Sequence, residues 1–452
     1  MKKSTGVPGE LEILQLLQDY VIWLKNSAFI SGMSVYVSAN FIVGWISWLF
    51  TIQASRLLTI EQLAVLSVFT SLTNILSVLP DAISTTISRF AAYWNEKKSE
   101  ALTIATMRLL IRTGFVISIS IIGLALVFER SISDFFKITP LYLRIFAPII
   151  FFLFLKSIFF GFLKAQLALK RISLILIISA LTKLALINLA GMQSLNRVIS
   201  LAILALVGSE LIAFTTSLFF ALKEKYMLSV FHTGVRLKTE IAREIYSFLF
   251  NSLFAKIGFV IINSIDFLLV KHYFSQKQAG QYALLVIMGN ILYFGAKMLF
   301  TALIPLVSRE QAQGRSGYRP MFLLTGMVGF AGLFGLFLYW QFPLDMMRFF
   351  IKKQDHFVAS YLLPYSGAMY LLAIASCIST FNIAKKNFLP SRFYIAGSAI
   401  IAIVIFLNHN RLQTVALLSA FILSITALTM IVYESIRLKK HISRIRTSYD
   451  VS

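Results

Sequence analysis

Charge is scarce in this sequence. Only 13% of its 452 residues are Asp, Glu, Lys or Arg, whereas 58% are hydrophobic and the mean hydropathy is +0.80. A soluble domain of this length does not need so much apolar sequence for its core. These proportions exclude a soluble enzyme or soluble binding protein and indicate an all-α, polytopic membrane protein.

The sequence also lacks the residues of several kinds of site. Its single cysteine, Cys377, excludes an intrachain disulfide, and the apolar stretch around it favours a buried side chain over a reactive thiol. Five histidines without a metal-ligand cluster predict no bound metal, and no Walker sequence or other cofactor motif is present. The net charge is +23, but the sequence contains no basic soluble domain that could bind nucleic acid, so we attribute the positive charge to cytoplasmic loops.

Apolar stretches of about 20 residues, enough to cross a bilayer, are abundant. Twelve qualify, at roughly 28–51, 62–90, 110–128, 141–163, 172–191, 198–221, 246–270, 281–307, 321–340, 358–383, 393–408 and 413–433. With both termini cytoplasmic, 27 of the 42 Lys and Arg residues lie near the inner face and 10 near the outer face, and five fall within spans. This bias predicts a multi-pass protein of the cytoplasmic membrane with both termini inside.

Two segments of the chain match each other. The stretch 62–76 lines up with 278–292 at a constant offset of 216 residues, so that Gln62 matches Gln278 and Asn74 matches Asn290. Six predicted spans separate the two stretches, an even number, so the halves are predicted to be parallel repeats. Such repeats face each other across the substrate cavity of many carriers, which makes transport the leading hypothesis.

The repeat and the loops predict the organisation of the chain. Residues 1–26 form an N-terminal tail with an amphipathic interfacial helix, because apolar residues recur there at helical spacing. Residues 27–222 and 246–434 form two pseudo-symmetric lobes of six helices each, joined by a basic cytoplasmic linker over 223–245. Residues 435–452 form a basic cytoplasmic tail, which is attracted to anionic membrane lipids.

Ionisable side chains within membrane spans usually face a cavity or a partner. Here the cations exceed the acids, which predicts an anionic substrate. Lys256 and Lys297 are the main candidates for binding a phosphate or pyrophosphate, because they lie near mid-span, too deep to reach the headgroups easily. The weaker candidates for the same cavity are Lys156, Lys183 and Arg144. The alternative for each of these residues is a structural ion pair or snorkelling to the membrane surface.

Three acidic residues within the spans are candidates for gating or ion coupling. Asp81 and Lys297 occupy equivalent places in the two repeats, so we expect them to pair across the central cleft in one gating state; alternatively, Asp81 is a turn residue beside a kink at Pro80. Asp266 is expected to pair with Lys271, with a coupling cation as the alternative. Glu210 lacks a partner in its own helix and is a candidate for proton coupling.

Several junction sequences resemble those of the polysaccharide flippases (Wzx-type) of the multidrug, oligosaccharidyl-lipid and polysaccharide exporter superfamily. They are Arg56–Gln62 after the first span, Ile87–Phe90 at the end of the second, and Ser264–Val270 leading to Gln278–Tyr282. The resemblance implies a MATE-like fold whose cationic cavity accepts the pyrophosphate and sugars of a polyprenyl-linked oligosaccharide. It further implies a flippase for cell-surface polysaccharide, without covalent chemistry, and leaves open a polysaccharide polymerase as partner. We expect the protein to be a monomer.

Four alternatives remain. A cation-coupled drug exporter of the same superfamily is disfavoured because the first span has no acidic residue, and a peptidoglycan lipid flippase because it would have fourteen spans. A major-facilitator carrier would need a Gly-rich, Asp-Arg-containing loop where this chain has residues 92–98. A membrane-embedded sugar-lipid enzyme would need acids in a large outer loop, and the longest outer loop, about 341–357, offers only Asp345 and Asp355.

Overall fold

The structure, a computed structural model, describes residues 28–192, 195–224, 237–300, 303, 307, 318–384, 387 and 389–449. Across these residues the chain forms helices joined by turns, and no strand occurs among them. The interfacial helix predicted over 1–26 lies outside the described residues, and so do residues 225–236 of the predicted linker. Residues 435–449 of the predicted tail continue the last helix.

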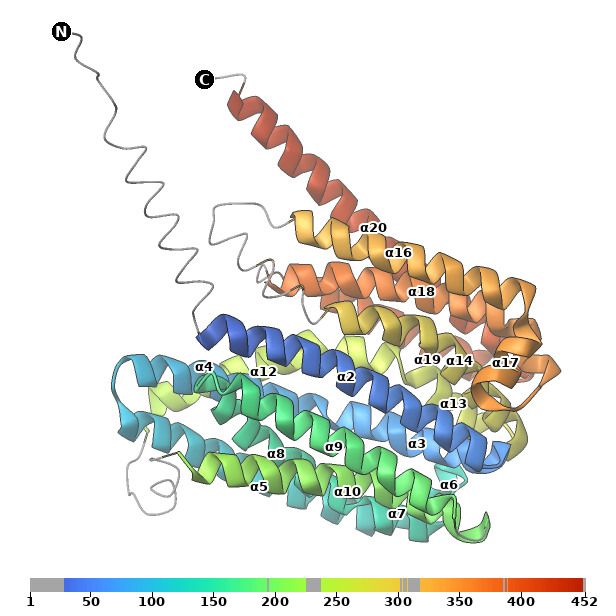
Figure 1. Cartoon of the computed structure of the whole chain (residues 1–452), viewed down its shortest axis with the longest axis horizontal. Helices are drawn as coiled ribbons and strands as arrows, with labels where there is room; N and C mark the ends of the chain where they lie inside the picture. The colour runs from blue at the N-terminus through green and yellow to red at the C-terminus, as the bar shows by residue number, and fades with distance from the viewer. Residues whose placement is uncertain are drawn as a thin grey trace.

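The helices of both halves are shown in Figure 1. The first half contains α2 (Ala28–Leu57), α3 (Ile60–Leu76), α4 (Val78–Glu96), α5 (Glu100–Val127), α6 (Glu129–Phe136), α7 (Pro140–Phe146), α8 (Pro148–Ala165), α9 (Leu169–Ala190) and α10 (Leu195–Leu222). The second half contains α12 (Thr239–Ile262), α13 (Ile265–Tyr273), α14 (Gln276–Phe300), α16 (Tyr318–Gln341), α17 (Pro343–Ile351), α18 (His356–Ala384), α19 (Pro390–Leu407) and α20 (Leu412–Tyr449).

Ten helical segments of the described chain are long and apolar enough to cross a membrane. Each overlaps one of the twelve predicted spans. The predicted eleventh span is a shorter apolar helix, Ser391–Leu407, and the predicted eighth corresponds to α14, which is described as far as Phe300. The predicted all-helical, multi-span fold is therefore confirmed.

Some spans are built from two helices rather than one. The second span divides at Ser77, which ends α3 and precedes α4. Pro80 has no N–H to donate to the carbonyl of Leu76, so the regular hydrogen-bond ladder is interrupted there. The division lies three residues before Pro80, and Asp81 belongs to the first turn of α4, so it is not the turn residue of the alternative prediction. The fourth span divides in the same way at Ala147, where Pro148 is the first residue of α8.

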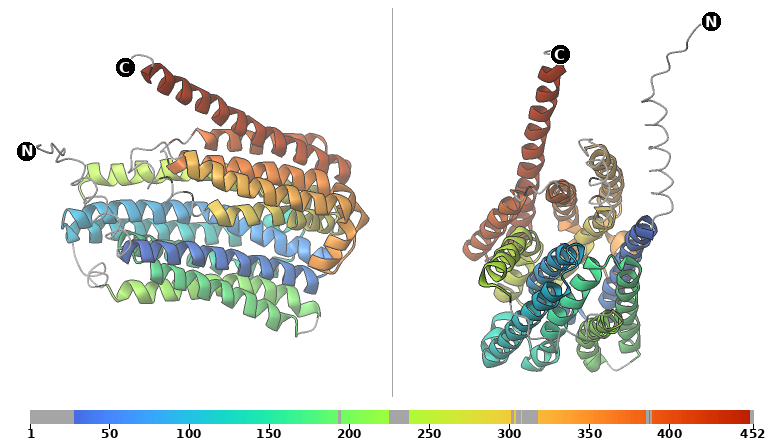
Figure 2. Two further views of the ribbon diagram at one scale, coloured as in Figure 1. Left: turned by 45° about the horizontal axis from the view of Figure 1, so that its top comes forward. Right: turned by 90° about the vertical axis from the view of Figure 1, so that its left-hand side faces the viewer.

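Contacts between helices are densest within each half. In the first half, α2 packs on α9, and α8 packs on α4, α5 and α10. In the second half, α18 packs on α14, α16 and α20, while α12 packs on α19. The halves meet where α3 contacts α14 and α4 contacts α12, and the helices run roughly side by side (Figures 1 and 2). At the α3–α14 contact, a Cβ on Gly280 would lie 2.2 Å from the carbonyl oxygen of Ile60, so this approach requires glycine.

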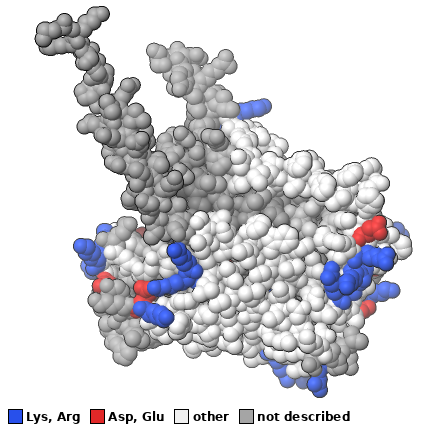
Figure 3. Space-filling view, viewed as in Figure 1, with Lys and Arg blue, Asp and Glu red and all other residues white. Residues whose placement is uncertain are grey.

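The surface has the character expected of a protein in a bilayer. Charged side chains gather toward the two ends of the helices, with a broad uncharged belt between them (Figure 3). Large apolar side chains are exposed on the described chain, among them Phe330, whose exposed fraction is 80%, and Trp340, at 64%. Exposed apolar area of this extent is stable only against lipid.

Candidate functional site

A cavity lies within the first half of the chain. Its volume is about 280 Å³, and α2, α3, α4, α8, α9 and α10 supply its lining. Asp81, Lys156, Lys183 and Glu210 all line it, together with several hydroxyl groups. Four of the eight residues predicted as site residues therefore meet in one cavity, although the sequence predicted a cavity between the halves.

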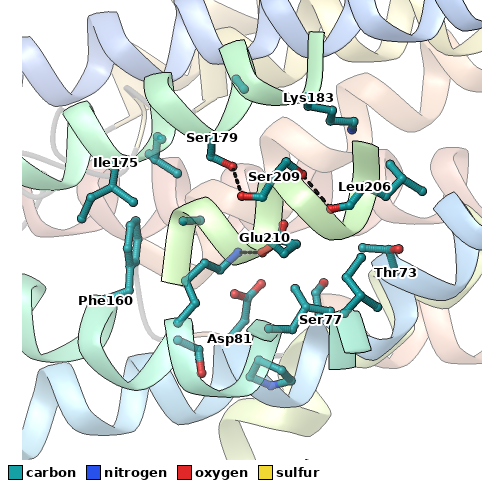
Figure 4. A pocket seen from close by; sticks show the side chains of 18 of the residues that line it. Thr73, Ser77, Asp81, Phe160, Ile175, Ser179, Lys183, Leu206, Ser209 and Glu210 are labelled. Atoms are coloured by element: carbon teal, nitrogen blue, oxygen red, sulfur yellow. Dashed lines mark hydrogen bonds and ion pairs between the residues drawn. The ribbon is translucent and has the colours of Figure 1, made fainter. Parts of the chain in front are cut away.

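An ion pair crosses this cavity. Lys156 of α8 donates a hydrogen bond to Glu210 of α10, and their side-chain exposed fractions are 24% and 17%. Beside the pair, the hydroxyl of Ser179 donates to the carbonyl of Ser209 over 3.0 Å. Figure 4 shows the carboxylate of Asp81 pointing toward Glu210 across the cavity. The partner that Glu210 lacks in its own helix comes from α8.

The second half of the chain reaches the wall of this cavity through Lys256 of α12. Its Nζ donates to Thr85 Oγ1 over 2.8 Å and to the carbonyl oxygen of Asp81 over 3.2 Å. Since Asp81 lines the cavity, Lys256 joins the first half to the second directly at the site. Lys256 is not itself among the lining residues of this cavity, so its predicted role in lining a substrate cavity stays a prediction.

Two more lysines complete the cluster. Lys183 lies over the ring of Phe50, with Nζ 4.2 Å from the ring centroid. Lys164, at the end of α8, lies 4.9 Å from the centroid of Phe160 and within electrostatic range of Asp81 and Lys256. The lining itself holds two lysines (156 and 183) and two carboxylates (81 and 210), which balance when all are ionised. Lys164 and Lys256 lie beside the lining and add two positive charges to its surroundings. Such a site attracts anions.

Sequence reasoning missed Lys164, which it assigned to the cytoplasmic loops. The signal was present, because Lys156, Phe160 and Lys164 recur at a spacing of four and therefore share one face of α8. That spacing places a second cation one turn beyond the aromatic residue of the cavity wall.

Arg144 and Asp266 do not line this cavity. Arg144 forms an ion pair with Glu129 at 2.9 Å, and its side chain is 64% exposed, as expected for the structural alternative. The side chain of Lys297 is outside the described part of the chain, so its pairing with Asp81 stays a prediction.

The predicted pairing of Asp266 with Lys271 is wrong. Asp266 is buried and accepts hydrogen bonds from the hydroxyls of Tyr282, at 2.9 Å, and Tyr365, at 2.8 Å. Lys271 donates to Gln276 instead. The reason is helical geometry, because five residues separate the two side chains by roughly 140° around α13.

Comparison with known proteins identifies the fold. No family model and no curated protein matches the sequence. Among solved structures, an inward-facing multidrug resistance MATE family transporter of the MOP superfamily superimposes with a TM-score of 0.70 at 11% identity, covering 90% of this chain and 98% of the other. The lipid II flippase MurJ, in an inward closed conformation, superimposes with a TM-score of 0.66 at 15% identity, and the alignment covers 88% of this chain and 87% of MurJ. A eukaryotic MATE transporter, AtDTX14, gives 0.64 at 13% identity, covering 90% and 95%.

These identities are too low to transfer a substrate, but the similarity extends over nearly the whole of each chain. Together with the ten long apolar helices, it establishes an integral membrane protein. The chain therefore has the fold shared by the MATE transporters and the MurJ flippase of the MOP superfamily.

Proposed function

We propose that this protein is a flippase, which moves an anionic polyprenyl-linked oligosaccharide outward across the cytoplasmic membrane by alternating access, for cell-surface polysaccharide biosynthesis. The observation that carries the proposal is the charge balance of the first cavity. Lys156 is paired with Glu210, whereas Lys183 and Lys256 have no carboxylate within ion-pair distance among the described residues. Lys164, Lys183 and Lys256 are then opposed by one further carboxylate, Asp81, which leaves a net excess of two positive charges around the cavity to attract a pyrophosphate.

The same balance argues against the main alternative. An exporter of cationic drugs would gain from an excess of carboxylates in its cavity, whereas here the two carboxylates of the lining are matched by two lysines, and Lys164 and Lys256 lie beside them. The enzyme alternative also loses support. Asp355, one of the two acids predicted in the outer loop, accepts from the backbone N–H of Val358 and from Gln281 Nε2, so it caps the start of α18.

The protein is proposed to act as a monomer, with the lipid tail of its substrate remaining in the membrane. Whether a polysaccharide polymerase receives the product is a separate question that co-purification from membranes would answer. The proposed function itself requires only the carrier and its lipid-linked substrate.

The test is flipping of a fluorescent undecaprenyl-pyrophosphate oligosaccharide in liposomes that contain purified protein. Wild type is expected to flip the lipid, and Lys183→Met and Lys256→Met are each expected to slow it at least tenfold at unchanged thermal stability. Lys223→Met is the matched control, because Lys223 is exposed at the end of α10 and lies over Phe219. Failure of wild type to flip any such lipid, with export of a cationic dye, would establish the drug exporter instead.

A further inference from the structure

A second cavity lies between the two halves of the chain. Its volume is about 120 Å³, and it is bounded by α2 and α3 on one side and by α13, α14 and Asn263 on the other. The first cavity lies behind the same two helices. Consecutive residues of α3, Thr73 and Asn74, line the first and second cavities respectively. The two cavities are therefore neighbours that share a wall.

The lining of the second cavity follows the internal repeat. Five pairs of lining residues are separated by the offset of 216 that the sequence repeat defines. The pairs are Thr51 and Phe267, Ser67 and Ala283, Thr70 and Val286, Ser71 and Ile287, and Asn74 and Asn290. Equivalent faces of the two repeats thus meet across this space, as expected of a cavity on the pseudo-twofold axis.

The chemistry of this lining differs from that of the first cavity. No Lys, Arg, His, Asp or Glu is among its lining residues, which are Trp48, Phe50, Thr51, Ala54, Leu63, Leu66, Ser67, Thr70, Ser71, Asn74, Asn263, Phe267, Ala283, Val286, Ile287, Asn290 and Phe294. A phosphate therefore finds no counter-charge here. Carboxamides and hydroxyls beside aromatic rings suit a neutral ligand with many hydroxyl or amide groups.

The side chains of Asn74 and Asn290 are available to such a ligand. Neither carboxamide makes a hydrogen bond to another residue of the described chain, whereas Asn263 of the same cavity donates to the carbonyl of Phe259 over 2.7 Å. Each free carboxamide offers two donor hydrogens and an acceptor oxygen, which matches adjacent sugar hydroxyls or an N-acetyl group. The two are the one identical pair among the five equivalent pairs of the lining.

We propose that this cavity is the saccharide-recognition site, in which Asn74 and Asn290 bind the sugar next to the pyrophosphate. The inference rests on the proposed function and divides the substrate between two cavities, with the phosphates at the lysines and the sugar between the halves.

The experiment measures binding of two probes to purified protein in nanodiscs. One probe is undecaprenyl pyrophosphate, and the other is the same lipid carrying an N-acetylhexosamine disaccharide. Wild type is expected to bind the glycosylated lipid at least tenfold more tightly than the bare lipid. Asn74→Leu and Asn290→Leu are expected to reduce this ratio to between one and three, with the affinity for the bare lipid unchanged. Asn188→Leu is the matched control, because Asn188 is an exposed residue of α9 that bonds only to its own helix.

The outcomes separate the two proposals. Failure of wild type to bind either lipid would overturn the proposed function and this inference together. Equal affinity of wild type for the two lipids, or a preference that survives in both asparagine variants, would overturn this inference alone. The variants are expected to fold, because neither carboxamide bonds to another described residue, and unchanged thermal denaturation of each variant verifies this.

Discussion

Lys137 and Lys353 lie 216 residues apart, and each donates a hydrogen bond from Nζ to a backbone carbonyl of the opposite half. Lys137 donates to Phe274 over 2.9 Å, and Lys353 donates to Leu58 as well as to Ser55. The two acceptors Leu58 and Phe274 are themselves 216 residues apart. The offset found in the sequence therefore recurs as a pair of equivalent contacts between the halves.

Each lysine contact is reinforced by a second contact in the reverse direction. Arg56 donates to the carbonyls of Phe349, at 3.0 Å, and Phe350, at 2.9 Å, at the end of α17. Its equivalent, His272, forms a hydrogen bond of 2.8 Å with the carbonyl of Phe135 at the end of α6. Side chains that meet the carbonyl ends of helices are favoured there by the unpaired oxygens and the helix dipole. We call these two sets of contacts the paired latches.

Loss of the Lys353 latch is expected to weaken the contact between the two halves at the end of the helices that the sequence predicts to face outward. Lys353→Met removes the hydrogen bonds to Ser55 of α2 and to Leu58, which follows α2, so we expect the halves to part more often at this end. The measurement is the labelling rate of Ser71→Cys, which lies in the cavity between the halves, by a membrane-impermeant thiol reagent in a Cys377→Ala background. An increase of about tenfold is expected, which corresponds to about 1.4 kcal/mol, the scale of one net hydrogen bond.

The neighbouring lysine supplies the control for this experiment. Lys352 is exposed, and its side chain makes no hydrogen bond to the described chain, although its backbone N–H donates to the carbonyl of Arg348, so Lys352→Met should leave the labelling rate unchanged. Equal acceleration by both substitutions would show that charge at this end, rather than the latch, governs opening. No acceleration by Lys353→Met would show that the latch does not limit opening at all.

Lys271 predicts a pH dependence of stability. Burial, and next the charge of Lys137, lower the pKa of Lys271 to about 8, from its ordinary value of 10.5. Between these two pH values the unfolded protein binds more protons at this residue than the folded protein does. The free energy of unfolding therefore gains a contribution that rises from pH 8 toward pH 10.5.

Thermal denaturation in detergent across this pH range checks the sign. Lys271→Met should be more stable than wild type at pH 7, where wild type carries a buried charge, and the difference should shrink as the pH approaches 10. A constant difference between the two proteins at every pH would show that the folded-state pKa of Lys271 is not lowered. Lys277→Met, an exposed lysine at the start of α14, serves as the control.

The sequence predicted the helices better than the site, for a physical reason. A membrane span can be recognised from its hydrophobicity and length, whatever its neighbours in the fold. The sequence match of Gln62 with Gln278 corresponds to two helices that begin in a similar way. Gln62 bonds to Thr59, and Gln278 bonds to Ser275, in the same arrangement. Which cavity a lysine enters depends on the rotation of its helix and on its neighbours in space, so Lys156 and Glu210, 54 residues apart, could not be paired from spacing alone.

The Lys156–Glu210 ion pair is expected to stabilise the first half. The effect of substituting one of these residues on the stability should therefore depend on whether the other has also been substituted. Glu210→Gln leaves Lys156 without its carboxylate in a mostly buried site. Breaking a fully buried pair costs about 3 to 5 kcal/mol, and partial exposure reduces the expected cost here to about 1 to 3 kcal/mol. The double variant Lys156→Met with Glu210→Gln should recover most of this loss, because no uncompensated charge remains. Purely additive losses in thermal stability would show that the pair is not coupled.

Substitutions at Asp266 distinguish a structural role of this residue from a role in ion coupling. Its carboxylate accepts from two tyrosine hydroxyls and, through Oδ1, from the N–H of Phe267 at 2.7 Å, which ties α13 to α14 and α18. Asp266→Asn can keep an acceptor for these donors but cannot hold a coupling cation by charge, so we expect flipping in liposomes within about threefold of wild type. Asp266→Leu removes every acceptor and should lower the stability by several kcal/mol, since each hydrogen bond to a charged group contributes about 1.5 to 3 kcal/mol. Loss of flipping in Asp266→Asn at unchanged thermal stability would contradict the structural role and assign Asp266 to ion coupling.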